Sequence, residues 1–145
     1  DLQTGTLVIT RNNPAPIYIG RGEQMEALNS ESSAIGTSRN IRPAISEIAL
    51  DGWISIVMYT DGISHAGDRY GLSLDIQTLL ESMLEDQNPT SQKIADAVLE
   101  QAIRLDQNRP NDDMSVVALR VLPFEGDLIR RMTVRLPVIF TPQQI

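Results

Sequence analysis

Apolar residues recur along the first half of this chain in short runs separated by polar turns. The runs predict β-strands at 7–10 and 17–19, a further strand around 25–28 and a weaker one at 45–50. The run at 54–59 is broken only by Ser55 and predicts a buried strand that ends just before Asp61. Asp51 and Gly52 predict a hairpin turn between the strands at 45–50 and 54–59. The polar stretch 29–43 predicts a long surface loop.

The spacing of apolar residues becomes helical after Gly71. It predicts a first helix with Ser73 as its cap and Asp75 in its first turn, and a second helix after the sequence NPTS. We expect both apolar stripes to be core faces that lie on a sheet, because this is the usual role of such stripes. The stripe residues are Ile76, Leu79, Leu80, Met83 and Leu84 in the first helix, and Ile94, Ala95, Val98, Leu99, Ala102 and Ile103 in the second.

Two more strands follow the helices. The sequence MSVVALRVL predicts a strong central strand, and after a turn at 123–127 the segment 128–140 predicts another strand. Pro137 favours an edge position for this last strand, where it could also pair with a second chain. The order of strands, two helices and strands predicts an α+β fold, with antiparallel sheet and a helical layer on it.

Composition narrows the classes of function. The chain has 145 residues, which is enough for one domain, and its net charge of −7 argues against a nucleic-acid partner. It has no cysteine and a single histidine, His65, so disulfides, thiolate zinc sites and His-rich metal sites are excluded or disfavoured. No apolar run approaches the roughly 18 residues of a membrane span, and no signal peptide opens the chain, which predicts a cytoplasmic protein. The start DLQTGTLVIT, without Met, predicts a piece of a longer protein.

Acidic residues stand at the ends of two predicted strands. Asp61 follows the strand at 54–59, and Asp112 with Asp113 precedes the strand at 114–122. If these strands are antiparallel neighbours, the carboxylates converge at one sheet edge and repel each other unless a cation lies between them. Oxygen ligands suit Mg²⁺ or Mn²⁺, which can activate a water for attack on phosphorus. Gly62 would leave room for backbone and water near the ion. The alternative is that both motifs are ordinary turns with solvated carboxylates.

The sequence YTDGISHAGDRYG, followed by two helices and NDDMSVVALRV, resembles the C-terminal half of metal-dependent Ser/Thr phosphatases of type 2C, the PPM superfamily. It is most similar to the bacterial branch that includes sporulation stage II protein E and RsbU. The segments RNNPAPIYI, AIGTS and ISEIALDGW resemble an Asn-Pro turn, a loop and a hairpin of that branch. The resemblance covers residues 1–122, which implies the C-terminal portion of a phosphatase domain, with 123–145 as an additional strand and tail.

This resemblance implies part of a four-layer αββα sandwich, in which an antiparallel β-sandwich is flanked by helices. It implies that Asp61 and Asp112 are metal ligands and catalytic residues, with Gly62 at the metal site and Asp113 as a second-choice ligand. The complete domain would bind two Mn²⁺ or Mg²⁺ ions, whose activated water attacks phosphoserine or phosphothreonine directly. The implied partners are a phosphoprotein substrate, such as an antagonist of an anti-sigma factor, and an upstream sensor or receiver domain. Homodimerisation is a further expectation.

The chain departs from the family pattern at three places. The N-terminal Asp and Gly-His-Gly-like metal motif is absent, Arg11 and Asn12 replace a Gly-His pair, and His65 replaces a residue that is often Glu. The missing motif leaves an alternative open, a phosphatase-like regulatory or binding module without activity. His65 is a candidate acid or phosphate contact, or a plain surface residue. Arg69, Arg104 and Arg109 are candidate phosphate contacts among which the sequence does not choose.

Overall fold

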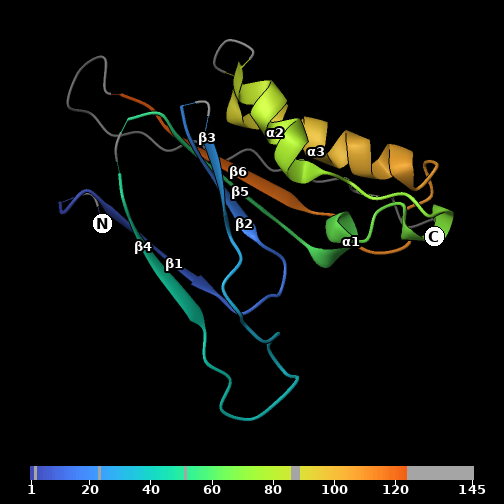
Figure 1. The fold of residues 1–145 in the computed structure, drawn as a ribbon, viewed down its shortest axis with the longest axis horizontal. Helices are drawn as coiled ribbons and strands as arrows, with labels where there is room; N and C mark the ends of the chain where they lie inside the picture. Colours follow the sequence, from blue (N-terminus) through green and yellow to red (C-terminus); the bar gives the residue numbers. More distant parts are fainter. Residues whose placement is uncertain (2, 23, 51, 86–88, 124–145) are drawn as a thin grey trace, which may run out of the picture.

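The structure is a computed structural model that describes residues 1, 3–22, 24–50, 52–85 and 89–123. Figure 1 shows its helices on one side of a sheet and a pair of strands diverging on the other side. The elements in chain order are β1 (Thr6–Arg11), β2 (Ile17–Arg21), β3 (Gln24–Leu28), β4 (Ala44–Ala49), β5 (Ile54–Tyr59), α1 (Asp61–Ser64), the 3₁₀ helix η1 (Asp68–Tyr70), α2 (Ile76–Glu85), α3 (Ser91–Leu105) and β6 (Val116–Val121).

The strands form two antiparallel sheets. One has four strands in the order β3-β2-β5-β6, and the other pairs β1 with β4. One core cluster lies between the two sheets and includes Ile9 and Ile48 from the small sheet with Ile19 and Ile56 from the large one. This arrangement of antiparallel sheets and helices confirms the predicted α+β class.

The helices cover the other face of the large sheet. Their buried residues Leu80, Ile94 and Val98 form a second core cluster with Val57 of β5 and Ile63 of α1. Both predicted helical stripes are therefore core faces, as expected from their spacing. Figure 1 shows α2 and α3 side by side above this sheet.

Two predictions about strand pairing were wrong. β4 does not form a hairpin with β5, because β4 pairs with β1 in the small sheet while β5 lies in the large one. The chain thus crosses from one layer to the other at this point, and Asp51 itself lies outside the described residues. Among the described strands, β6 lies at the edge of the large sheet and pairs only with β5, where a central strand was predicted.

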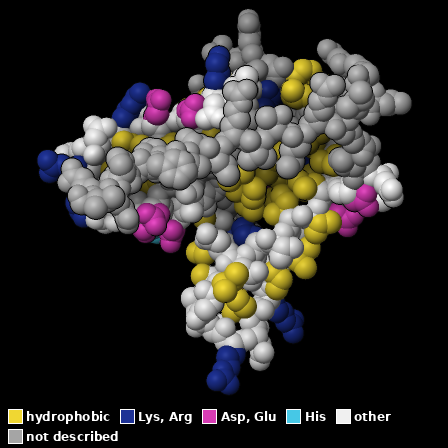
Figure 2. Space-filling view, turned by 180° about the vertical axis from the view of Figure 1, so that it is seen from behind, with side chains coloured by type: hydrophobic (Ala, Val, Ile, Leu, Met, Phe, Trp, Pro, Cys, Tyr) yellow, Lys and Arg dark blue, Asp and Glu magenta, His cyan; other side chains and the backbone are white. Residues whose placement is uncertain are grey.

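The position of β6 explains its side-chain pattern. Its burial alternates, and Val117 and Leu119 remain 55% and 44% exposed. Figure 2, seen from behind, shows hydrophobic side chains gathered in the middle of this face and continuing onto the part that projects downward. Other large exposed hydrophobic residues include Val8 of β1 and Ile45 of β4.

The start of α2 differs from the prediction. Ser73 was expected to cap the helix with Asp75 in the first turn, but the helix begins at Ile76 and has no acidic residue in its first turn. Asp75 is the capping residue instead, since its carboxylate accepts hydrogen bonds from the Thr78 N–H at 3.0 Å and the Thr78 hydroxyl at 2.8 Å. These two hydrogen bonds lower the pKa of Asp75 below its usual value.

The remaining predictions about the chain have mixed outcomes. Residues 29–43 contain no helix or strand, which confirms the predicted loop. The predicted strand at 128–140 lies outside the described residues. Within the described parts of the chain, no helix has the length and apolar character needed to cross a bilayer.

Candidate metal centre

The pairing of β5 with β6 brings the two acidic motifs to one sheet edge. The strands are antiparallel, and Tyr59, the last residue of β5, is opposite Val116, the first residue of β6. Asp61 and Asp112 therefore lie just beyond the same end of adjacent strands. The structure confirms the strand arrangement on which the predicted convergence depended.

Thr60 fastens these two strand ends together. Its N–H donates to the Ser115 carbonyl at 3.1 Å, and its hydroxyl donates to the Asp113 carbonyl at 2.9 Å. The same hydroxyl accepts a hydrogen bond from the Ser115 N–H at 2.9 Å. Thr60 was not among the predicted site residues, and its only signal in the sequence is a hydroxyl residue directly before Asp61. Its three bonds fix the position of Asp61 relative to the loop that carries Asp112.

Gly62 forms the closest contact between the two motifs. It is buried in α1, and a Cβ atom built on it would lie 2.5 Å from the Asp113 carbonyl oxygen and 3.1 Å from its carbon. Any side chain at this position would push the 112–113 backbone away from α1. The structure therefore requires glycine at position 62 because of the Asp113 backbone, and the predicted room for water near an ion stays a prediction.

The carboxylates of both motifs are exposed at this edge. Asp61 accepts a hydrogen bond from the Gly62 N–H at 3.2 Å, and Asp112 accepts one from the Asp113 N–H at 2.7 Å. Each of these bonds is local to its own turn, and both aspartates are exposed. These exposed oxygens are hard donors of the kind that Mg²⁺ and Mn²⁺ prefer.

The carboxylate oxygens of Asp61 and Asp112 are of the chemical type that Mg²⁺ and Mn²⁺ bind. Mg²⁺ sites commonly use one or two carboxylates and retain several waters, which matches a pair of exposed aspartates. Across the described ranges, no group of three or more His, Cys, Asp or Glu residues is arranged to hold a metal. The described residues thus supply two acidic motifs at one sheet edge, and no arranged group of three acidic ligands.

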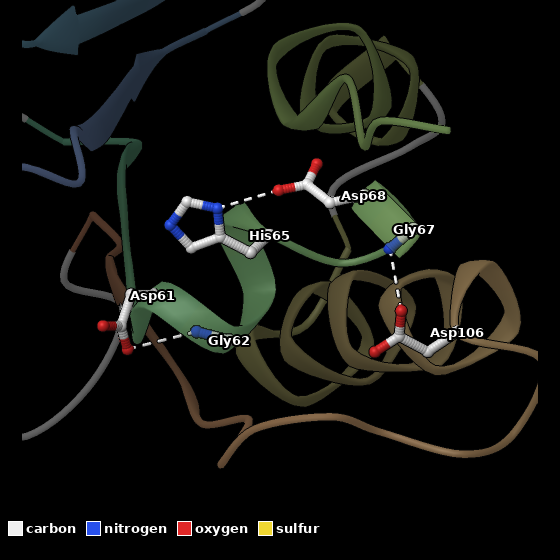
Figure 3. A network of polar contacts seen from close by, with 6 residues as sticks. All are labelled: Asp61, Gly62, His65, Gly67, Asp68 and Asp106. Carbon is white, nitrogen blue, oxygen red and sulfur yellow. Dashed lines mark hydrogen bonds and ion pairs between the residues drawn. The ribbon is translucent and has the colours of Figure 1, made fainter. Parts of the chain in front are cut away.

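The buried side chain of Asp106 joins the loop after α1 to the loop that carries Asp112. It is only 4% exposed and follows the last turn of α3. One carboxylate oxygen accepts from the Gly67 N–H at 2.8 Å and the other from the Asn111 N–H at 3.3 Å. Figure 3 shows this carboxylate directed at the Gly67 nitrogen. Asp106 was not among the predicted site residues, and its only signal in the sequence is an acidic residue directly after an amphipathic helix.

We expect Asp106→Ala to lower the free energy of unfolding by about 2 kcal/mol, because it leaves two main-chain donors without their acceptor. Urea denaturation followed by circular dichroism measures this loss. Asp96→Ala is a matched control, since Asp96 is an exposed carboxylate on the same helix and should change stability far less. Equal stability of the two variants would show that the buried carboxylate does not hold the loops.

His65 lies one helical turn after Asp61. Its Nδ1 is 2.9 Å from the Asp68 carboxylate, and the two side chains are 71% and 58% exposed. Figure 3 shows the His65 ring above α1, with Asp68 on one side and Asp61 on the other. An exposed pair of this kind contributes little to stability. A catalytic role for His65 stays a prediction.

A tyrosine pair lies at the end of β5 that leads to Asp61. The rings of Tyr18 and Tyr59 are stacked with centroids 6.3 Å apart and an angle of 19° between their planes. Burial raises the pKa of Tyr59, and the neighbouring Tyr18 raises it further. Both hydroxyls therefore stay neutral at physiological pH.

Tyr59 also lines a cavity of about 190 Å³ next to Arg11. Arg11 is 5% exposed, and its guanidinium donates to the carbonyls of Asn13, Pro14, Ala15 and Ser30. Arg11, which stands where many relatives have glycine, therefore stabilises the Asn-Pro turn through hydrogen bonds to its main-chain carbonyls.

The comparisons with known proteins show the family and the fold of the chain. The family model described as stage II sporulation protein E (SpoIIE) matches residues 1–122. Among proteins of curated function, none is similar enough in sequence to add to this match.

Solved structures share the fold. The chain is 21% identical to the phosphatase domain of the cell fate determinant SpoIIE from Bacillus subtilis (Mn presoaked), with a TM-score of 0.68 over 88% of this chain and 56% of that one. PppA, a regulatory component of the type VI secretion system in Pseudomonas aeruginosa, gives 15% identity and a TM-score of 0.56 over 80% and 52%. The SiaA-PP2C domain of Pseudomonas aeruginosa gives 22% and 0.54 over 74% and 44%. The chain thus spans about half the length of the structures it matches.

Proposed function

Since the chain belongs to the stage II sporulation protein E (SpoIIE) family, we propose that it forms part of a PP2C-type phosphatase that hydrolyses phosphoserine or phosphothreonine on a regulatory protein. The convergence of Asp61 and Asp112 at one sheet edge carries this proposal. It favours the enzyme over an inactive binding module, because two exposed carboxylate loops fastened together repel each other without a cation.

The proposed chemistry assigns a role to each residue of the edge. Asp61 and Asp112 would hold the Mn²⁺ or Mg²⁺ ions, and Asp113 is the second-choice ligand. Gly62 allows the 112–113 backbone to lie against α1, and Thr60 keeps the two loops in register. When bound, such ions supply charge neutralisation at the phosphoryl group and an activated water for direct attack on phosphorus. The described residues themselves position the ligands and leave the edge open to a protein substrate.

We propose that the complete site uses ligands beyond those that the described residues supply. The described residues offer no group of three acidic ligands, and the chain spans 56% of the SpoIIE phosphatase structure that it matches. The exposed apolar residues Val8 of β1, Ile45 of β4 and Val117 and Leu119 of β6 support this proposal, because exposed apolar residues on sheet strands are typical of surfaces that pack against further structure. An upstream sensor or receiver domain, and pairing of two copies, are proposals of the same kind.

The first test is hydrolysis of a phosphoserine peptide by the 1–145 chain and by the complete protein that contains it. Phosphate release should require Mn²⁺ or Mg²⁺ in the complete protein and stop when a chelator removes the ion. The isolated chain should release phosphate much more slowly. Absence of turnover in the complete protein, or turnover that survives the chelator, would contradict the proposed function.

A further inference from the structure

Three arginines, Arg69, Arg104 and Arg109, were candidate phosphate contacts in the sequence, and their surroundings in the structure differ. Arg104 lies on α3 and forms an ion pair with Glu100 at 3.5 Å, one helical turn away. Arg109 lies in the turn after α3, and its N–H donates to the Asp106 carbonyl. Arg69 alone among the three has its guanidinium hydrogen-bonded to a residue next to a candidate metal ligand, since it donates to the Asn111 side-chain oxygen.

The backbone fixes Arg69 in this place. It lies in η1 between Gly67 and Gly71, whose φ angles of 88° and 67° are positive and favour glycine. A Cβ on Gly67 would lie 2.9 Å from the Leu72 Cβ, so this turn is also tightly packed. Because the Asp106 carboxylate accepts from both Gly67 and Asn111, one buried group sets the distance between the Arg69 loop and the Asp112 loop.

The guanidinium of Arg69 retains donors for a ligand. A guanidinium carries five N–H donors in a planar fork that matches the oxygens of a phosphate, and Asn111 accepts from only one of its nitrogens. Over the residues that the structure describes, Arg69 forms no ion pair with a carboxylate. Arg69 is exposed, and its partner Asn111 adjoins Asp112, so a ligand that approaches the Asp112 loop can reach it.

Because this edge is negatively charged, a phosphoryl group needs cationic partners in order to bind there. Asp61, Asp112 and Asp113 present three carboxylates, and the whole chain carries a net charge of −7. A phosphoryl dianion approaching this surface is repelled unless cations face it. Metal ions at the aspartates would face one side of the phosphoryl group, and a fixed arginine beside them would supply bidentate hydrogen bonds from another side.

Building on the proposed function, we propose that Arg69 binds the phosphoryl group of the substrate and that Asn111 positions its guanidinium beside the Asp112 loop. Arg104 and Arg109 are not part of this site. The substrate class is a phosphorylated serine or threonine in an exposed segment of a protein.

The test is calorimetric titration of the complete protein, in Mg²⁺, with a peptide that carries a non-hydrolysable phosphonate analogue of phosphoserine. The plain serine peptide is the reference. Arg69→Ala should weaken phosphonate-peptide binding about tenfold, because one charge-assisted contact is lost, and leave any serine-peptide binding unchanged. Arg104→Ala is the matched control and should bind as the wild type does.

Two further variants separate binding from folding. Arg69→Lys keeps the charge and a donor for Asn111 but loses the planar fork, so it should weaken binding less than Arg69→Ala does. Asn111→Ala keeps the Arg69 guanidinium but removes the hydrogen bond that positions it. This variant should lose an amount of phosphonate-peptide affinity between that of the wild type and that of Arg69→Ala. Melting temperatures show whether each variant is folded, and Arg69→Lys carries the test if Arg69→Ala is not.

The outcomes are distinct from those of the hydrolysis assay. If neither Arg69→Ala nor Arg69→Lys weakens phosphonate binding while the wild type hydrolyses phosphoserine, this inference is overturned and the proposed function stands. If the wild type binds both peptides equally, the inference is also overturned, and hydrolysis alone decides the proposed function. A loss that is equal for Arg69→Ala and Arg104→Ala would show only a general effect of charge.

Discussion

Replacing Asp112 by Asn is expected to reduce the Mn²⁺-dependent kcat/KM of the complete protein by about a hundredfold or more. The substitution keeps size and one oxygen but removes the negative charge that would hold the cation, and a metal ion supplies several kcal/mol of transition-state stabilisation. Asp61→Asn should have an effect of the same size, since both residues lie at the same end of the β5–β6 pair. Phosphate release at saturating and limiting Mn²⁺ measures the change.

Asp96→Asn is the matched control for these variants. Asp96 is an exposed carboxylate on α3 that accepts a hydrogen bond from Gln92 at 2.7 Å, away from the strand ends. Its substitution should leave kcat/KM unchanged. Asp113→Asn tests the second-choice ligand and should cost less than Asp112→Asn. Full activity in both Asp61→Asn and Asp112→Asn would show that this sheet edge is not the metal centre.

Gly62→Ala is expected to lower the free energy of unfolding by about 1–3 kcal/mol and to weaken Mn²⁺ binding as well. The added Cβ would lie 2.5 Å from the Asp113 carbonyl oxygen, which is backbone and cannot move without shifting the 112–113 loop. The same steric contact should therefore lower stability and increase the separation between Asp61 and the 112–113 loop. Urea denaturation and a Mn²⁺ titration of the same preparation measure the two effects.

Gly22→Ala is a control that separates loss of stability from loss of Mn²⁺ binding. Gly22 has a φ of 60° but no atom within 4 Å of its added Cβ, so alanine there introduces backbone strain without steric contact. We expect it to cost about 1–2 kcal/mol of stability and to leave Mn²⁺ affinity unchanged. If Gly62→Ala binds Mn²⁺ as the wild type does, the contact with Asp113 does not set the geometry of the site.

The sequence predicted the elements well because their signals are local. The apolar run at 54–59, the helical stripe through Ile94 and Val98, and the polar loop at 29–43 each depend on the residues within one segment. The two acidic motifs were also found from local order, since each one adjoins a strong strand. The cap of α2 was misassigned by two residues, because Ser73 and Asp75 are both good capping residues and the choice depends on which of them meets Thr78.

Partners distant in the sequence could not be found in this way. The pairing of β4 with β1 depends on Ile9 and Ile48 facing the larger sheet, and the run at 45–50 carries no information about which strand it joins. β6 has the apolar content of a central strand, but only its neighbours decide that Val117 and Leu119 stay exposed.

By itself the sequence determined the α+β class, the two helices and the pair of acidic motifs, because hydrophobic periodicity and strand-end residues act over a few positions. Only the tertiary structure decided three contacts: Thr60 joins the end of β5 to the Asp113 loop, Asp106 joins Gly67 to Asn111, and Arg69 is the arginine hydrogen-bonded beside Asp112. The hydrogen bonds of Thr60, Gly67 and Arg69 each join residues about 40 or more positions apart in the sequence. Their geometry therefore exists only after the sheet and the helices have packed.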